Sequence, residues 1–203
     1  MQLYDSPNPA PNPRRVRIFM AERGVSAPIV SVDLAKGEHK TPAHRALNPL
    51  GQTPVLVLDD GVAISETVAI CRYLDEITPG ESLFGSDARE RALTDMWIRR
   101  VEFVLMQPVG AFWRHAHPRT AALLTQYKDY GESNRETFAG ACRFFDRALG
   151  ATEHIAGARY TMADICAQTT LDFANLIGLE TPPGLDALSR WRSAVGARPS
   201  AAA

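Results

Sequence analysis

Three cysteines are the strongest potential nucleophiles in the sequence, and their spacing limits what they can do. Cys71, Cys142 and Cys166 are far apart, odd in number and each set among apolar residues. No two of them have the CxxC spacing of a redox or zinc site, and a secreted disulfide framework would use an even, denser set. We therefore expect each cysteine to be a small buried apolar side chain.

A second group that could carry chemistry is the stretch Phe112-Trp113-Arg114-His115-Ala116-His117-Pro118. Histidine changes its charge near neutral pH and can exchange protons or bind metals. Side chains two positions apart on a helix do not face each other, so His115 and His117 are not expected to bind a metal together. The sequence predicts no metal site.

Composition and charge narrow the class of protein. Of the 203 residues, 45% are hydrophobic, 22% charged and 8% aromatic, which is typical of a globular chain and excludes disorder throughout. Lys and Arg number 22 against 23 Asp and Glu, so no basic surplus favours a nucleic-acid or membrane partner. The N-terminus lacks the pattern of a signal peptide, and no run approaches the ~18 apolar residues of a membrane span. We expect a cytoplasmic protein with no nucleic-acid or membrane partner.

Residues 1–79 alternate short apolar runs with helix-like stretches, in the order β-α-β-α-β-β-α. Strands are expected at Gln2–Tyr4, Ile29–Leu34, Val55–Leu58 and Val62–Ile64. Asn12 and Pro13 are typical of the N-cap and first position of a helix that runs to Gly24. Further helices are expected within 36–48 and over Glu66–Ile77, and Asp59-Asp60-Gly61 is a hairpin turn signal. This order favours a small mixed sheet with helices on its faces.

Residues 80–86 are expected to be a linker, and residues 87–203 an all-helical domain of about five helices. One helix is predicted over Arg89–Met106, and the spacing of Phe138, Cys142, Phe145 and Leu149 predicts another. Thr161 and Asp164 have the spacing of an acidic variant of the capping box at a helix start. A last helix should bury Leu185, Leu188, Trp191 and Val195.

Four strings in this order resemble one family, the glutathione transferases. They are Asn12–Arg17, Asn48–Val55, Ile64–Ile70 and Thr161–Asp164. The resemblance covers nearly the whole chain and is strongest to a bacterial and fungal theta-like subgroup. It implies a fold of class α/β plus all-α, with an N-terminal thioredoxin-like domain followed by a C-terminal helical bundle. It also implies glutathione as co-substrate and a homodimer.

Each string also has a plain structural interpretation. Pro54 could simply start an edge strand, and Glu66-Thr67 could simply open a helix. The resemblance instead implies a cis bond between Thr53 and Pro54, with the main chain of Thr53 turned to glutathione. It implies that Glu66 binds the γ-glutamyl ammonium and Thr67 the γ-glutamyl carboxylate. The donors for the glycyl carboxylate would be His39 and Gln52.

A glutathione transferase must make a thiolate, because the thiolate is the nucleophile. Most classes of the family place a Tyr, Ser or Cys near the first loop, but Ala10-Pro11-Asn12-Pro13 offers neither a hydroxyl nor a thiol where a theta-like serine is expected. The segment 112–118 resembles the one in which fungal members without the usual residue carry an active histidine, which implies His115, acting through water with Thr120 as a helper. The other catalytic candidates are the side-chain amide of Asn12, and Ser6. Asn12 is equally well explained as a helix cap.

The resemblance therefore implies an enzyme that transfers glutathione to a small apolar electrophile. Phe112 and Trp113 would wall the site of that electrophile, although aromatic residues also suit plain helix packing. Two alternatives remain: a non-catalytic binding or interaction protein that keeps the fold, and a glutathione-dependent peroxidase. No cysteine begins the first helix, so disulfide-exchange chemistry has little support.

Overall fold

The computed structural model describes residues 1–6 and 10–203, which divide into two units. One unit comprises Met1–Ser82 together with Pro199–Ala203, and the other comprises Leu83–Arg198. The first is an α/β unit and the second is all-helical, so the predicted fold class is confirmed. The last five residues group with the α/β unit rather than with the helices that precede them.

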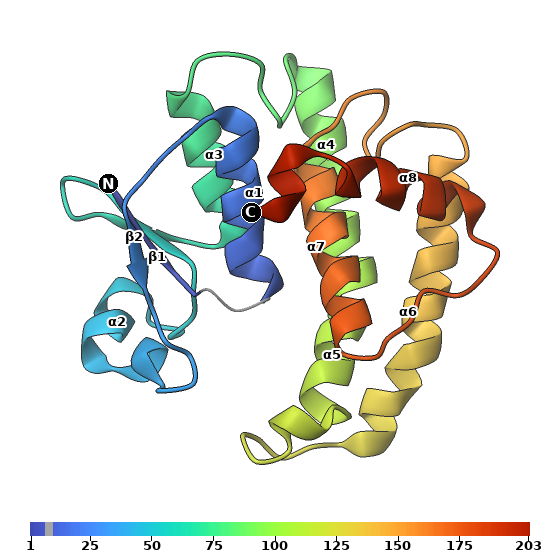
Figure 1. Ribbon diagram of the computed structural model, residues 1–203, viewed down its shortest axis with the longest axis horizontal. Helices are drawn as coiled ribbons and strands as arrows, with labels where there is room; N and C mark the ends of the chain where they lie inside the picture. Colours follow the sequence, from blue (N-terminus) through green and yellow to red (C-terminus); the bar gives the residue numbers. More distant parts are fainter. Residues whose placement is uncertain (7–9) are drawn as a thin grey trace. The chain divides into compact units, whose positions relative to one another are not determined.

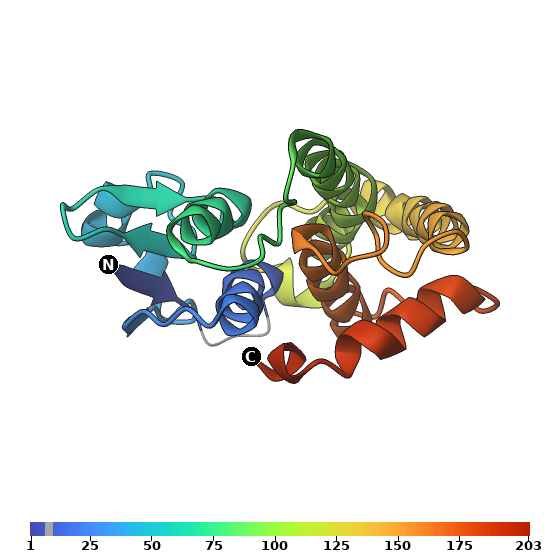
Figure 2. The same cartoon turned by 90° about the horizontal axis from the view of Figure 1, so that it is seen from above.

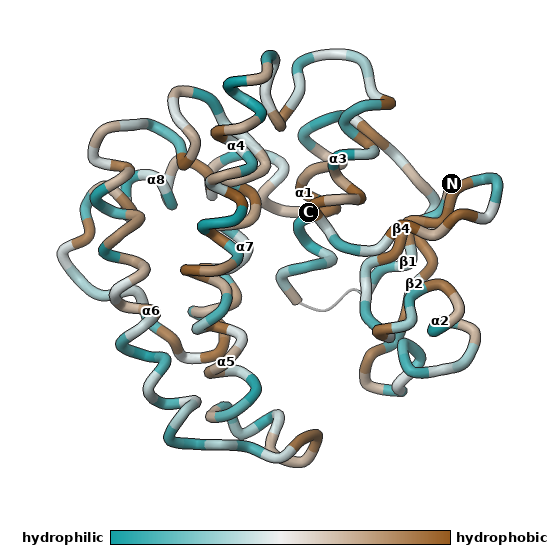
Figure 3. Tube along the Cα trace, turned by 180° about the vertical axis from the view of Figure 1, so that it is seen from behind, coloured by the Kyte–Doolittle hydropathy of each residue, from teal (hydrophilic) through white to brown (hydrophobic). Residues whose placement is uncertain are grey.

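A four-stranded mixed sheet in the order β2-β1-β3-β4 forms the centre of the α/β unit. β1 pairs in parallel with β2 and antiparallel with β3, and β3 pairs antiparallel with β4. The tube of Figure 3 is coloured as hydrophobic along much of these strands. The strands are short, and their bounds are Gln2–Asp5 (β1), Ile29–Ser31 (β2), Val55–Val57 (β3) and Ala63–Ser65 (β4).

The ends of the strands differ from the sequence prediction where turns begin. β2 ends at Ser31, although Val32 beyond it is buried, because the chain turns into a bend stabilised by Asp33. The predicted turn after β3 is confirmed. Gly61 has a φ of 87°, and the main-chain N–H of Leu58 donates to the oxygen of Val62 at 2.8 Å.

Helix α1 spans Pro11–Arg23, so the prediction that Asn12 caps it was wrong. Ala10 is the N-cap and makes no side-chain hydrogen bond, and Asn12 lies inside the first turn. Proline is well suited to the first helical position because its φ is already helical and an N–H there would have no partner in the helix. Pro11 therefore begins the helix ahead of Asn12. The helix ends at Gly24 as predicted, with a left-handed φ of 63°.

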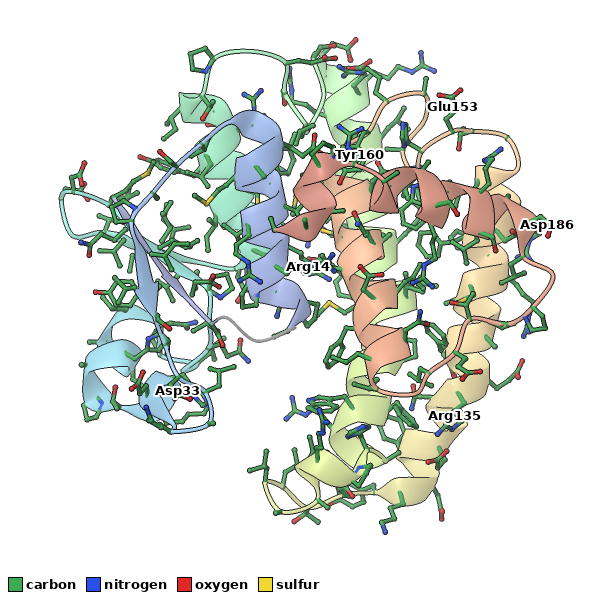
Figure 4. All side chains as sticks on the ribbon, in the orientation of Figure 1. Arg14, Asp33, Arg135, Glu153, Tyr160 and Asp186 are labelled. Atoms are coloured by element: carbon green, nitrogen blue, oxygen red, sulfur yellow. The ribbon has the colours of Figure 1, made fainter. Side chains whose placement is uncertain are left out.

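The other helices of this unit are η1 (Glu38–Lys40), α2 (Pro42–Leu47), α3 (Thr67–Ile77) and η4 (Pro199–Ala202). α1 and α3 pack against each other beside the sheet, and α2 lies apart from that pair (Figures 1 and 2). Fully buried apolar side chains join these helices to the strands, among them Leu3, Val16, Phe19, Leu56, Ile70 and Leu74. Arg14 of α1, labelled in Figure 4, donates to the main-chain oxygen of Ala201 at 2.8 Å and so ties η4 to the unit.

The helical unit contains α4 (Ala88–Arg100), the π-helical segment η2 (Val101–Met106), α5 (Gln107–His115), η3 (Pro118–Thr120), α6 (Lys128–Leu149), α7 (Met162–Leu176) and α8 (Asp186–Gly196). A single helix ending at Met106 was predicted, but the chain stays helical to His115. The wider π turn shifts the helical register. Within it, Val101 and Leu105 are buried, whereas Val104 is exposed.

α7 begins with the predicted capping box. The Asp164 carboxylate accepts from the main-chain N–H of Thr161 at 2.8 Å and from the indole N–H of Trp191 on α8 at 2.8 Å. The predicted stripes on α6 and α8 are buried as expected. Across the described residues, no helix combines the length and apolar character that crossing a membrane requires.

Candidate functional site

One edge of the sheet gathers several of the predicted site residues. Tyr4 pairs with Val55, and Val55 pairs with Ser65. Because these pairs are antiparallel, the end of β1, the start of β3 and the end of β4 lie at the same edge. Ser6, the Thr53-Pro54 pair and the Glu66-Thr67 pair follow or precede those strand ends directly, so the register brings them together.

The Thr53–Pro54 peptide bond is cis, as the resemblance implied. Thr53 lies two residues ahead of Val55, where pairing of β3 with both of its neighbours begins. The main-chain groups of Thr53 therefore lie beyond the paired part of the strand. An extended peptide placed along this edge could pair with them as an added strand would.

The loop ahead of Thr53 is held by side chains from and beside α2. The Nε2–H of His44 and the side-chain amide of Asn48 both donate to the main-chain oxygen of Gln52, each at 3.0 Å. The ammonium of Lys40 donates to the oxygen of Gly51 at 3.0 Å. Nothing in the spacing of these three residues along the sequence indicates that they converge on one loop.

Glu66 has a φ of 71°, which an L-residue other than glycine rarely adopts. It is the N-cap of α3, its side chain is exposed, and Thr67 behind it is buried. Strained backbone of this kind is retained mainly where function requires it. The arrangement puts an acidic side chain and a hydroxyl at a helix N-terminus, where main-chain N–H groups are available to an anion.

His39 lies on η1 and is half-buried. Its Nδ1 is buried and has no hydrogen-bond partner among residues 1–6 and 10–203. Burial, with the positive charge of Lys40 next to it, holds the pKa of the His39 imidazole below its usual range. The Gln52 side chain is exposed. A buried imidazole nitrogen without a partner is suited to accept or donate a hydrogen bond to a ligand.

Ser6 and Asn12 flank the segment 7–9, which lies outside the described residues. The Ser6 side chain is fully buried, and its Oγ has no partner in the described part of the chain. Asn12 is half-buried in the first turn of α1. Pro11 and Pro13 have no N–H, so among the first three residues of the helix only Asn12 has a main-chain N–H to donate.

His115, Phe112 and Trp113 belong to the helical unit and lie together at the end of α5. The Nδ1 of His115 accepts from the main-chain N–H of Tyr127 at 3.4 Å. The Thr120 hydroxyl, the proposed helper, is buried and donates to the main-chain oxygen of Trp113 at 2.6 Å. His117 stacks on Trp113 with ring centroids 4.6 Å apart, and burial lowers its pKa.

The two aromatic residues of this segment are not equivalent. Phe112 is 3% exposed, and the guanidinium of Arg135 (Figure 4) lies 4.3 Å from the centroid of its ring. Trp113 is half-buried and also contacts Phe173 of α7, with centroids 5.4 Å apart. Trp113 therefore has surface left for a ligand, whereas Phe112 is part of the core.

Comparison with protein families matches both units. Residues 10–77 match the model "Glutathione S-transferase, N-terminal domain", and residues 104–199 match "Glutathione S-transferase, C-terminal domain". Among curated proteins, glutathione S-transferase 2 of Saccharomyces cerevisiae is 36% identical over 204 residues, which cover 98% of this chain and 87% of the relative.

Solved structures give the same answer. A glutathione S-transferase domain-containing protein of Marinobacter aquaeolei VT8 is 40% identical, with a TM-score of 0.92 over 98% of this chain and 99% of the other. Gtt2 of Saccharomyces cerevisiae is 37% identical, with a TM-score of 0.91 over 98% of each chain. The likeness therefore extends through both units.

Proposed function

Because the chain belongs to the glutathione S-transferase family and is an enzyme of that family, we propose that it transfers the glutathione thiolate to small apolar electrophiles. In this reaction the sulfur anion forms a bond to carbon and the leaving group departs with the bonding electron pair. The thiol's proton is released before the attack. The product is a thioether, and neither oxidation nor reduction occurs.

The observation that carries the proposal is the strained Glu66 at the same edge of the sheet as Thr53, whose main-chain groups lie ahead of the paired residues of β3. Glutathione is an extended tripeptide whose γ-glutamyl end carries an ammonium and a carboxylate. The Glu66 carboxylate would bind the ammonium, and the Thr67 hydroxyl with the N-terminus of α3 would bind the carboxylate. The main chain of Thr53, next to Pro54, would pair with the cysteinyl residue.

His39 and Gln52 would bind the glycyl carboxylate at the other end of the tripeptide. The unpartnered Nδ1 of His39 supports this role, because a carboxylate would satisfy it. The bonds from His44 and Asn48 support it indirectly, because they hold the main chain of Gln52 in place. Positive charge on Lys40 also favours an anionic end here.

The chemical task is to ionise the thiol near neutral pH. A free thiol has a pKa near 8.5, and lowering it by about two units takes about 2.7 kcal/mol of selective stabilisation of the anion. The N-terminus of α1 would supply up to about 2 kcal/mol of this. One hydrogen-bond donor to the sulfur would supply the rest.

We propose His115 as the group of the helical unit that acts on the thiol through a water molecule, with Asn12 and Ser6 as alternatives. Residues 10–13 contain no hydroxyl or thiol, which supports activation of the glutathione thiol by a group from elsewhere in the chain. The main-chain N–H of Asn12 supports a direct role for that residue, and the unpartnered hydroxyl supports Ser6. These features fit a theta-like enzyme without the usual catalytic residue.

Trp113, backed by the buried Phe112, is the proposed wall of the electrophile site. Its half-buried indole offers an apolar face next to His117. An enzyme of this kind would act in detoxification, in the cytoplasm and as a homodimer. The net charge of −1 is consistent with a small-molecule substrate rather than a nucleic acid.

A conjugation assay with a chromogenic aromatic electrophile tests the proposal. The parent protein should form the thioether, and His115→Ala should lower kcat/KM by about 10–100-fold, the effect of losing one donor to a developing anion. Asn12→Ala and Ser6→Ala identify which alternative contributes. If all three variants conjugate glutathione at the parent rate, none of these residues is catalytic and the assignment is wrong.

A non-catalytic glutathione-binding protein is the competing function, favoured by the missing hydroxyl at residues 10–13. Retention on immobilised glutathione without conjugation of any electrophile tried would support it. Glu66→Gln is the matched control, because it should abolish retention if the tripeptide binds as proposed. Reduction of a hydroperoxide by glutathione without conjugation would instead favour a peroxidase.

A further inference from the structure

The first turn of α6 and its N-cap contact the imidazole of His115. α5 and α6 pack side by side (Figure 1), and the last residue of α5 is His115. Tyr127, the N-cap of α6, donates its main-chain N–H to the Nδ1 of His115 at 3.4 Å. The rings of Tyr127 and Tyr130 lie 5.6 and 5.5 Å from the imidazole, measured between centroids. The imidazole is therefore contacted by one hydrogen bond and two rings.

Gly131 lets α6 approach the end of α5 closely. A Cβ at this position would lie 2.6 Å from the main-chain carbon of His115 and 2.6 Å from the main-chain nitrogen of Ala116. Backbone atoms cannot move aside as a flexible side chain can. The position of His115 is thus set by contact between two helix backbones as well as by the contacts of its ring.

These contacts determine which nitrogen of His115 carries the proton. A neutral imidazole has one N–H and one nitrogen lone pair. Since Nδ1 accepts the N–H of Tyr127, its lone pair is occupied and the proton belongs on Nε2. The ring then offers a hydrogen-bond donor, and no free acceptor, to a ligand.

We infer that the main-chain N–H of Tyr127 holds His115 as an Nε2–H donor, so that His115 stabilises the thiolate rather than removing the thiol's proton. The inference rests on the proposed function, which assigns His115 to the thiol. The proton of the thiol then passes to bulk water, and the Nε2–H of His115 donates to the water that binds the sulfur. Tyr127 is a positioning residue in this scheme.

Nitrogen-15 NMR of the histidine side chains tests the tautomer without any measurement of activity. In the neutral imidazole, Nδ1 of His115 should give the shift of an unprotonated nitrogen and Nε2 that of a protonated one. The signal is assigned by its loss in His115→Gln. A protonated Nδ1, or the averaged shifts of a free imidazole, would overturn the inference and leave the proposed function untouched.

Two substitutions of His115 separate a donor from a base. A glutamine side chain can donate a hydrogen bond but cannot take up a proton at neutral pH. His115→Gln should therefore keep kcat/KM within a few-fold of the parent, whereas His115→Ala should lose about 10–100-fold. Equal losses in both would make His115 a base and overturn the inference. No loss in His115→Ala would overturn the proposed role of His115 itself.

Tyr127→Pro and Tyr127→Ala form a matched pair for the donor. Both lack the phenol ring, but only proline lacks the main-chain N–H. Tyr127→Ala should keep the Nε2–H tautomer, and Tyr127→Pro should give a mixture and a lower kcat. An unchanged tautomer in a folded Tyr127→Pro protein would overturn the inference. If that variant does not fold, the NMR measurement on the parent decides.

Discussion

The Nε2–H of His44 donates to the main-chain oxygen of Gln52 at 3.0 Å, and the side-chain amide of Asn48 donates to the same oxygen at 3.0 Å. Both donor residues are buried. One carbonyl thus has two donors, and the loop that leads to Thr53 is held by side chains that would not themselves touch glutathione. This makes the shape of the proposed binding edge dependent on residues behind it.

Removing these donors should weaken glutathione binding in a non-additive way. His44→Ala and Asn48→Ala each leave the oxygen of Gln52 with one donor, so each should raise the Kd of glutathione only a few-fold. The double variant leaves this part-buried carbonyl without either donor, which should cost about 1 kcal/mol more unfolding free energy than the two single changes together. Denaturant unfolding and calorimetric titration measure both quantities. The control is Asn175→Ala, which removes an exposed amide of the helical unit. If the effects of His44→Ala and Asn48→Ala simply add up in the double variant, the two residues do not share the role described here.

Relieving the strain at Glu66 should stabilise the protein and impair binding. Glycine adopts a positive φ without penalty, so Glu66→Gly should raise the free energy of unfolding by up to about 1 kcal/mol. The same change removes the proposed partner of the γ-glutamyl ammonium, so glutathione affinity should fall. Glu66→Gln keeps the strain and should lose affinity without gaining stability. A Glu66→Gly protein that binds glutathione as tightly as the parent would show that this carboxylate has no binding role.

Glutathione affinity should depend on the protonation of His39. Burial holds the pKa of this imidazole below its usual value of 6.5 in the free protein. A bound carboxylate stabilises the imidazolium and raises that pKa, so the complex takes up a proton on binding. Affinity should therefore rise as the pH falls through the pKa of the complex, and level off below the lowered pKa of the free protein. In titration calorimetry across this pH range, the affinity of His39→Gln for glutathione should not change with pH. If the affinities of parent and variant change with pH by the same amount, the pH dependence comes from another group.

The three cysteines should be inert in the folded protein. Cys71, Cys142 and Cys166 are buried and form no disulfide with one another, as the sequence predicted, and burial raises the pKa of Cys142 to about 12. Only the thiolate reacts with a disulfide reagent, so none of the three should react at neutral pH until the chain unfolds. The number of thiols modified with and without denaturant measures this. Rapid reaction of even one thiol in the native protein would be inconsistent with their burial.

The fold was largely predictable because local patterns and the packed structure agree. The period of Phe138, Cys142, Phe145 and Leu149 marks a helix face that is buried in α6, and Thr161 and Asp164 form the capping box that their spacing predicts. Predictions failed where two local signals compete. Pro11 and Asn12 can each open a helix, and the proline did so.

The site was predictable only in part because much of it depends on contacts between distant segments. Glu66 and Thr67 could be identified from their string, but the positive φ of Glu66 leaves no trace in its residue type. The π turn at Val101–Met106 shifted the helix that carries His115, and hydrophobic periodicity does not reveal such a turn. The bond from Tyr127 to His115 joins two helices across an irregular loop, so spacing along the chain could not predict it.

The pH titration of bound glutathione by its thiolate ultraviolet absorbance tests the central claim most directly. A protein that ionises the thiol should show the thiolate signal with an apparent pKa about two units below that of free glutathione. The signal should shift toward the free value in His115→Ala, and Asn175→Ala should leave it unchanged. If glutathione binds at saturation and its thiol still titrates like the free tripeptide, the chain holds the ligand without activating it, and the account is contradicted.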